Sequence, residues 1–167
     1  MEHKSGFVNI IGSPNVGKST LMNSLLGQKI SIITSKAQTT RHRILGILND
    51  SKYQIIFSDT PGVITPSYKL QENMMHYVYS SFKDADIILY MLEFGSKKLK
   101  DKKLISILRE TQLPLFILLN KIDLSNQSDI ENEINRLKSE FSPDVILPIS
   151  ALNNFNLDSL IECIIDF

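Results

Sequence analysis

The sequence predicts a doubly wound α/β fold of three layers, in which helices cover both faces of a mostly parallel, six-stranded sheet. Six apolar runs of strand length alternate with helix-periodic segments, and several runs are apolar on both faces, as a sheet covered on both sides requires. The long helical connections exclude an antiparallel sandwich, whose strands are joined by short turns. One short hairpin, through the turn NDSK, makes one strand antiparallel.

The predicted elements run in the order strand, helix, strand, strand, and then helix and strand in alternation. Each strand is an apolar run, and the six are expected at 7–11, 43–48, 53–58, 86–92, 115–120 and 145–150. Each helix has apolar residues at spacings of three and four, and these segments are expected at about 18–27, 69–83, 100–111, 128–140 and 155–166. No repeat or linker interrupts this order, so we expect a single domain over residues 1–167.

Composition excludes several classes of protein. The chain has 167 residues, 43% of them hydrophobic, which is enough to bury a substantial core. Lys and Arg together equal Asp and Glu together, at 18 each, so no global basic field indicates nucleic acid. The single cysteine, Cys163, excludes an internal disulfide and a zinc cluster, and its helical spacing places it in the core. No run reaches the ~20 apolar residues of a membrane span, and the N-terminus does not match a secretory signal, which predicts a cytoplasmic protein.

A glycine-containing segment follows the first predicted strand. The sequence GSPNVGKS, residues 12–19, matches G-x-x-x-x-G-K-[ST] and precedes a predicted helix. Such glycines let successive backbone N–H groups point inward, Lys18 can reach the β- and γ-phosphates, and Ser19 offers a hydroxyl to Mg²⁺. The helix N-terminus adds its positive dipole end. The pattern predicts a polyphosphate site made of Gly12, Ser13, Pro14, Asn15, Val16, Gly17, Lys18, Ser19 and Thr20.

The segment SDTPG, residues 58–62, follows the third predicted strand. Asp59 can face a magnesium ion, usually through a bound water, and the Gly62 N–H can meet a γ-phosphate. Taken alone, DTPG also fits an ordinary turn, because Pro61 and Gly62 stand in favoured turn positions. Its position after a phosphate loop favours the metal site.

Polar segments after the fifth and sixth strands predict the choice of base. In NKID, Asp123 can accept hydrogen bonds from guanine N1–H and the N2 amine, whereas adenine has neither donor and would leave a buried anion unpaired. Asn120 can tie this loop to the phosphate loop, and the stem of Lys121 can lie over the base. The segment SAL can bring a backbone N–H to guanine O6, although SAL alone has almost no specificity. The predicted guanine site consists of Asn120, Lys121, Asp123, Ser150, Ala151 and Leu152.

The ordered set GSPNVGKS, DTPG, NKID and SAL resembles the TRAFAC class of P-loop GTPases over the whole chain. The segment GQKISIITSKAQTTRHRILGI, residues 27–47, is more narrowly similar to the bacterial Era family; relatives with tandem GTPase domains usually read P-G-T-T-R-D where this chain has QTTRH. The resemblance implies a Ras-like G domain that binds GTP and GDP with Mg²⁺ and hydrolyses GTP. In the Era family a KH RNA-binding domain follows, whereas this sequence stops at Phe167, so we expect the GTPase domain alone.

The resemblance also implies partners and a location. It implies a role in small ribosomal subunit assembly and 16S rRNA maturation, with 16S rRNA bound mainly through the KH domain. It implies a monomer in the cytoplasm, and it allows peripheral association with the inner face of the cell membrane, which no amphipathic stretch requires. Five lysines in 95–103 could contact RNA, but Asp101 and the flanking sequence favour a solvated helix start.

The same resemblance assigns two switch segments. Switch I lies between the first helix and the second strand, and its threonine coordinates Mg²⁺ when GTP is bound; we expect Thr40, with Thr39 as the alternative. Switch II covers residues 60–76. The predicted metal ligands are therefore Ser19, Thr40 and Asp59.

The hydrolysis step is predicted to be slow. Many GTPases place a glutamine after the switch II glycine to orient water, but here that position is Val63, which can neither donate nor accept. Some GTPases with a hydrophobic residue there recruit K⁺ through an asparagine that matches Asn15, and K⁺ would supply the charge of an arginine finger. Asn15 could instead cap the loop's own backbone. The predicted catalytic residues are Lys18, Thr40, Gly62 and Asn15, with Arg41 or Arg43 in cis as a weaker alternative.

Three other functions stay open at this point. A nucleotide kinase could share the phosphate loop, but NKID and the lack of an arginine-rich lid argue against it. A guanine-nucleotide-binding module with negligible unaided hydrolysis is compatible with Val63. Another ribosome-assembly GTPase of the same class would carry the same motifs.

Overall fold

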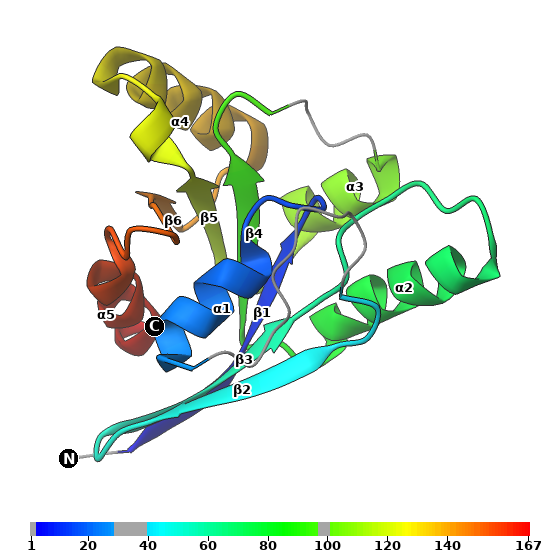
Figure 1. Ribbon diagram of the computed structural model, residues 1–167, viewed down its shortest axis with the longest axis horizontal. Helices are drawn as coiled ribbons and strands as arrows, with labels where there is room; N and C mark the ends of the chain where they lie inside the picture. Colours follow the sequence, from blue (N-terminus) through cyan, green and yellow to red (C-terminus); the bar gives the residue numbers. More distant parts are fainter. Residues whose placement is uncertain (1–2, 29–39, 97–100) are drawn as a thin grey trace.

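The computed structural model describes residues 3–28, 40–96 and 101–167, which form the predicted three-layer α/β fold (Figure 1). Within these residues the strands are β1 (Lys4–Gly12), β2 (Ile44–Asn49), β3 (Tyr53–Asp59), β4 (Ile87–Glu93), β5 (Leu115–Asn120) and β6 (Val145–Pro148). The helices are α1 (Lys18–Leu26), α2 (Lys69–Ser80), α3 (Lys102–Glu110), α4 (Gln127–Phe141) and α5 (Leu157–Asp166). Short 3₁₀ helices follow α2 (η1, Ser81–Lys83) and β5 (η2, Ile122–Leu124).

The sheet has the strand order β2-β3-β1-β4-β5-β6. Strand β2 pairs antiparallel with β3, and the other neighbouring strands pair in parallel, as predicted. The predicted hairpin closes where the Asp50 N–H donates to the Tyr53 carbonyl at 2.8 Å. Because parallel strands end at the same edge, the loops after β1, β3, β5 and β6 meet there, where ligands collect in open α/β sheets.

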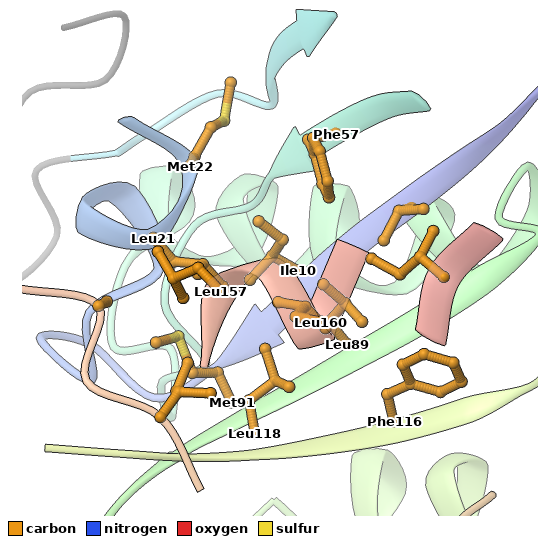
Figure 2. Close-up of a cluster of buried hydrophobic side chains, with 14 of the residues drawn as sticks. Ile10, Leu21, Met22, Phe57, Leu89, Met91, Phe116, Leu118, Leu157 and Leu160 are labelled. Atoms are coloured by element: carbon orange, nitrogen blue, oxygen red, sulfur yellow. The ribbon is translucent and has the colours of Figure 1, made fainter. Parts of the chain in front are cut away.

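Two apolar clusters hold the helices to the two faces of the sheet. Side chains alternate along a strand, so Ile10 of β1 faces one cluster and Ile11 the other. The cluster in Figure 2 packs α1 and α5 against the sheet through Leu21, Met22, Phe57, Leu118, Leu157 and Leu160. The second cluster packs α2, α3 and α4 through Met75, Val78, Leu104, Leu108 and Leu137. Cys163 is partly buried against the first cluster, as its spacing predicted.

The ends of some elements differ from those predicted. Strand β1 begins at Lys4, before its apolar run, because Lys4 and the next residues pair in register with β3. Helix α5 begins at Leu157, later than expected, because a bridge between Ser150 and Phe155 closes a turn before it. In the described part of the chain, none of the helices has the length and apolar character to cross a membrane.

Candidate nucleotide-binding site

The phosphate loop, residues 12–19, joins β1 to α1 at the carboxyl edge of the sheet. Gly17 has φ 107°, a backbone conformation that residues with a side chain rarely adopt. A Cβ at this position would lie 2.3 Å from Asn120 Nδ2. A Cβ on Gly12 would lie 2.3 Å from the Met91 carbonyl oxygen. Both glycines are therefore required by close packing against neighbouring strand ends. The loop also contains Ser13, Pro14, Asn15 (φ 63°) and Val16, and Thr20 lies in the first turn of α1.

Lys18 lies inside this loop and is 6% exposed. Its Nζ donates to the carbonyl oxygens of Gly12, at 3.0 Å, and Ser13, at 2.9 Å. Burial lowers the pKa of Lys18 to about 8, while the nearby Asp59 carboxylate acts to raise it. An anion bound in the loop would favour the charged form of Lys18, since a close negative charge stabilises an ammonium group.

Three oxygen-bearing side chains meet beside the start of α1. Ser19 Oγ donates to Asp59 Oδ2 at 2.6 Å and lies 3.2 Å from Thr40 Oγ1. Asp59 is fully buried at the end of β3. Hydroxyl and carboxylate oxygens are the ligands that Mg²⁺ prefers, so this group fits the predicted metal site. Thr39, the alternative ligand, lies outside the described residues.

The start of the predicted switch II segment packs directly on the phosphate loop. A Cβ on Gly62 would lie 2.8 Å from backbone atoms of Pro14, so only glycine fits there without a shift. The Val63 N–H donates to the Gly12 carbonyl at 3.0 Å. The Val63 side chain is 5% exposed and packs in the α2-side cluster. It therefore has neither the chemistry nor the exposure to orient a water molecule.

Asn120, at the end of β5, links three loops. Its side chain is buried, and Nδ2 donates to the Val16 carbonyl at 2.8 Å. This bond is the predicted tie between NKID and the phosphate loop. The Asn120 Oδ1 also accepts from the Ala151 N–H at 2.9 Å, a second link that the sequence did not predict.

The Asp123 carboxylate faces the segment after β6. Its Oδ1 accepts from Ser150 Oγ at 2.7 Å, and Ser150 Oγ accepts in turn from Asn153 Nδ2 at 3.1 Å. Asp123 is exposed in this structure. Its desolvation, and hence its power to reject adenine, would require a base to cover it. The Leu152 side chain is 78% exposed, so this residue can contribute through its backbone.

Lys121 has an acidic partner that the sequence analysis missed. Its backbone has φ 64°, and its Nζ lies 3.0 Å from Glu93 Oε1. Glu93 is the last residue of β4 and pairs in register with Asn120 of β5. An acidic residue at the carboxyl end of the neighbouring strand was the available signal.

Arg41 and Arg43 are the two arginines predicted as weaker candidates for stabilising the transition state from within the chain. Arg41 is exposed. The Arg43 guanidinium donates to Ser58 Oγ and Asn9 Oδ1, at 2.5 and 3.1 Å, and pairs with Asp84. Asn9 alternates with residues of the α1-side cluster, so these contacts lie on the α2 face of the sheet. The three partners of the Arg43 guanidinium, Ser58, Asn9 and Asp84, all lie outside the phosphate loop.

The sequence matches a known family and a curated relative. The profile of a family described as 50S ribosome-binding GTPase matches residues 7–121. The GTPase Era of Alkaliphilus metalliredigens is 43% identical over 169 residues, an alignment that covers 100% of this chain and 57% of that protein. The chain thus spans little more than half the length of this curated relative.

Solved structures of Era also match. The structure of Era in complex with MgGDPNP and nucleotides 1506–1542 of 16S ribosomal RNA aligns with a TM-score of 0.93 and 38% identity, covering 99% of this chain and 57% of that one. A variant of Aquifex aeolicus Era bound to GDP·AlF₄⁻ aligns with a TM-score of 0.89 and 38% identity, covering 98% and 57% of the two chains. The similarity therefore covers every described part of the candidate site.

Proposed function

Because the chain belongs to the 50S ribosome-binding GTPase family and shares the Ras-like P-loop fold of Era, we propose that it is the GTP-hydrolysing switch domain of an Era-type protein. The observation that carries the proposal is the pair of hydrogen bonds made by Asn120. They fix the phosphate loop, through Val16, and the loop after β6, through Ala151, to one strand end. One nucleotide can then contact the phosphate loop and the base loop together.

Within this proposal each loop has a separate task. The backbone amides of the phosphate loop and the Lys18 ammonium bind the phosphates, and Asp123 selects guanine. Ser19, Thr40 and Asp59 hold Mg²⁺, which neutralises charge on the β- and γ-phosphate oxygens. The Gly62 N–H binds the γ-phosphate, so loss of that phosphate releases both Thr40 and Gly62 and changes the surface that the domain presents.

Slow intrinsic hydrolysis follows from the residue after Gly62. The buried Val63 cannot orient the attacking water, and Arg43 is held on the α2 face of the sheet. Asn15 would hold K⁺, which would supply the missing positive charge. If turnover is negligible without a partner, the domain acts as a binding module that requires activation.

The partners follow from the relatives. The Era of known structure is bound to part of 16S ribosomal RNA, and we extend this class of partner to the whole protein that contains this domain. The domain would then supply the switch for small-subunit assembly. The monomeric state, the cytoplasmic location and peripheral membrane association stay predictions of the resemblance.

Calorimetry with GDP·Mg²⁺ and ADP·Mg²⁺ tests nucleotide recognition. We expect GDP to bind at least ~100-fold more tightly than ADP, because adenine leaves the carboxylate of Asp123 without its two donors. Equal heats for the two nucleotides, or none for GDP, would contradict the proposal.

Phosphate release from GTP tests the catalytic part. We expect faster release in KCl than in NaCl, and Asn15→Ala should remove the difference between the two salts. A salt-independent rate would contradict the K⁺ assignment. No release in either salt would leave the guanine-nucleotide-binding module as the function.

A further inference from the structure

A closed polar cluster lies under the start of β2, on the sheet face that α2 covers. Arg43 Nε donates to Ser58 Oγ at 2.5 Å, one terminal nitrogen donates to Asn9 Oδ1 at 3.1 Å, and the other pairs with Asp84. Asn9 Nδ2 donates to the Ser81 carbonyl and lies 3.4 Å from Asp84 Oδ1. We call these five residues the Arg43 cluster. It joins the start of β2 to β1, to β3 and to the segment after α2.

Most of the Arg43 cluster is removed from water. Asn9, Ser58 and Ser81 are fully buried, and the Arg43 side chain is 21% exposed, whereas Asp84 is 47% exposed at the rim. Buried polar groups are costly to leave unpaired, so the closed set of hydrogen bonds favours a single arrangement. The buried hydrogen bonds to Asn9 and Ser58 should therefore hold Arg43 more firmly than its ion pair with the exposed Asp84 does.

Arg43 lies in the chain between Thr40 and the first paired residue of β2. Strand β2 is an edge strand, and its first ladder pair joins Ile44 to Asp59. Arg43 stands just before that pair, and its partner Ser58 stands just before Asp59. Thr40 is three residues earlier, outside the ladder, with its hydroxyl 3.2 Å from Ser19 Oγ. The Arg43 side chain thus fixes the chain to β1 and β3 at a point between Thr40 and the ladder.

We propose that Arg43 is a positioning residue for Thr40: by fixing the start of β2 to β1 and β3, it holds the Thr40 hydroxyl beside Ser19 and Asp59. This role rests on the proposed function, because Thr40 acts as a metal ligand only if the domain binds GTP with Mg²⁺. It also replaces the arginine-finger role for Arg43, since the guanidinium acts through the strand and does not touch the phosphates.

A double-mutant cycle between Arg43 and Thr40 tests the proposal. The dissociation constants of fluorescent GDP and of a non-hydrolysable GTP analogue, both with Mg²⁺, are measured for the wild type, Arg43→Ala, Thr40→Ala and the double variant. We expect Arg43→Ala to lower the affinity for the GTP analogue ~10-fold and the affinity for GDP less than ~2-fold. The reason is that Thr40 is proposed to coordinate Mg²⁺ only when the triphosphate is bound. In the Thr40→Ala background, Arg43→Ala should cause no further loss.

Other variants separate positioning from general stability. Arg136 also makes two ion pairs, with Glu133 and Glu140 on α4, so Arg136→Ala is the matched control and should leave the ratio of the two constants unchanged. Asp84→Asn, at the exposed rim, should reduce the GTP-analogue affinity less than Arg43→Ala does. If Arg43→Ala does not fold, Arg43→Lys, which keeps the charge but loses the planar fork, takes its place in the cycle.

Two results would overturn the positioning role. One is an equal loss of GDP and GTP-analogue affinity in the Arg43 variant, which would mark a purely structural residue. The other is a full additional loss in the Thr40→Ala background. A wild-type domain that binds neither guanine nucleotide would instead refute the proposed function, so the two failures are distinguishable.

Discussion

Asp123 is the residue on which the predicted choice of base depends, and its neighbours define how it can be tested. Its Oδ1 accepts from Ser150, a bond that an asparagine oxygen could keep. In Asp123→Asn the new amide N–H₂ can donate to O2 of xanthine, where guanine has a donor of its own. We therefore expect GDP affinity to fall at least ~100-fold and xanthosine diphosphate affinity to rise, measured by competition. Unchanged guanine preference would refute the assignment, and Asp158→Asn, an exposed acid on α5, is the control.

The lowered pKa of Lys18 predicts that nucleotide affinity depends on pH. Its pKa is lowered to about 8 by burial, so an increasing share of free protein has a neutral Lys18 above that pH. Phosphate favours the ammonium form, and the complex then binds more protons than the free protein, so affinity falls as pH rises. Between about pH 7 and about pH 8.5 we expect GDP affinity to fall ~4-fold. Calorimetry in two buffers of different ionisation enthalpy should show proton uptake at the higher pH, and a pH-independent affinity would contradict this.

Much of the site was predictable because its residues act through local sequence. The phosphate loop needs glycines where a Cβ would strike Met91 or Asn120, and this requirement appears in the sequence as a spaced motif. The Arg43 cluster could not be predicted in this way, because it joins residues from four separate segments. Its members become neighbours only when the strand order is known, and the sequence analysis did not predict that order.

At the level of elements, Asp101 shows how one side chain joins two helices. Its Oδ1 caps α3 by accepting from the Leu104 N–H at 2.9 Å, and its Oδ2 accepts from the Tyr79 hydroxyl of α2 at 2.7 Å. Burial, together with Asp101, raises the pKa of Tyr79, so this phenol stays protonated as a donor. The sequence predicts a solvated helix start at the lysines around Asp101 and indicates no role for the Asp101 carboxylate.

Replacement of Asp101 should measure both contacts. We expect Asp101→Ala to lower the free energy of unfolding by about 2 kcal/mol, because the helix cap and the bond to Tyr79 are both lost. Asp101→Asn should cost less, since an asparagine oxygen still caps the helix. Urea unfolding gives these values, and Asn126→Ala, which removes the cap of α4 and an exposed hydrogen bond to Asp129, should cost about 1 kcal/mol. Equal losses for Asp101→Ala and Asn126→Ala would show that the bond to Tyr79 contributes nothing.

The helix and strand pattern itself was largely predictable. Runs such as LFILLN of β5 are buried on both faces, and amphipathic helices such as α3 bury Leu104 and Leu108 at a spacing of four. Periodicity therefore located every predicted element to within a few residues. It could not locate the start of β1, where polar residues join the sheet because β3 supplies their backbone partners.

For the whole molecule, one sheet carries both clusters and the site, so ligand binding should stabilise the entire domain. A ligand that binds only the folded state at ~100 times its dissociation constant adds about 2.7 kcal/mol to the free energy of unfolding. For a chain of 167 residues, we expect this to raise the melting temperature by ~5 to 10 °C.

Comparing GDP, ADP and xanthosine diphosphate tests whether the rise in melting temperature depends on the base. The loops that we propose contact the nucleotide follow β1, β3, β5 and β6, so GDP·Mg²⁺ should shift one cooperative transition and leave no part of the sheet to melt separately. ADP·Mg²⁺ at the same concentration should cause almost no shift, because Asp123 loses its donors. In Asp123→Asn, xanthosine diphosphate should restore the shift that GDP no longer gives. A GDP shift confined to part of a two-step transition would mean that the site and the sheet are not one cooperative unit.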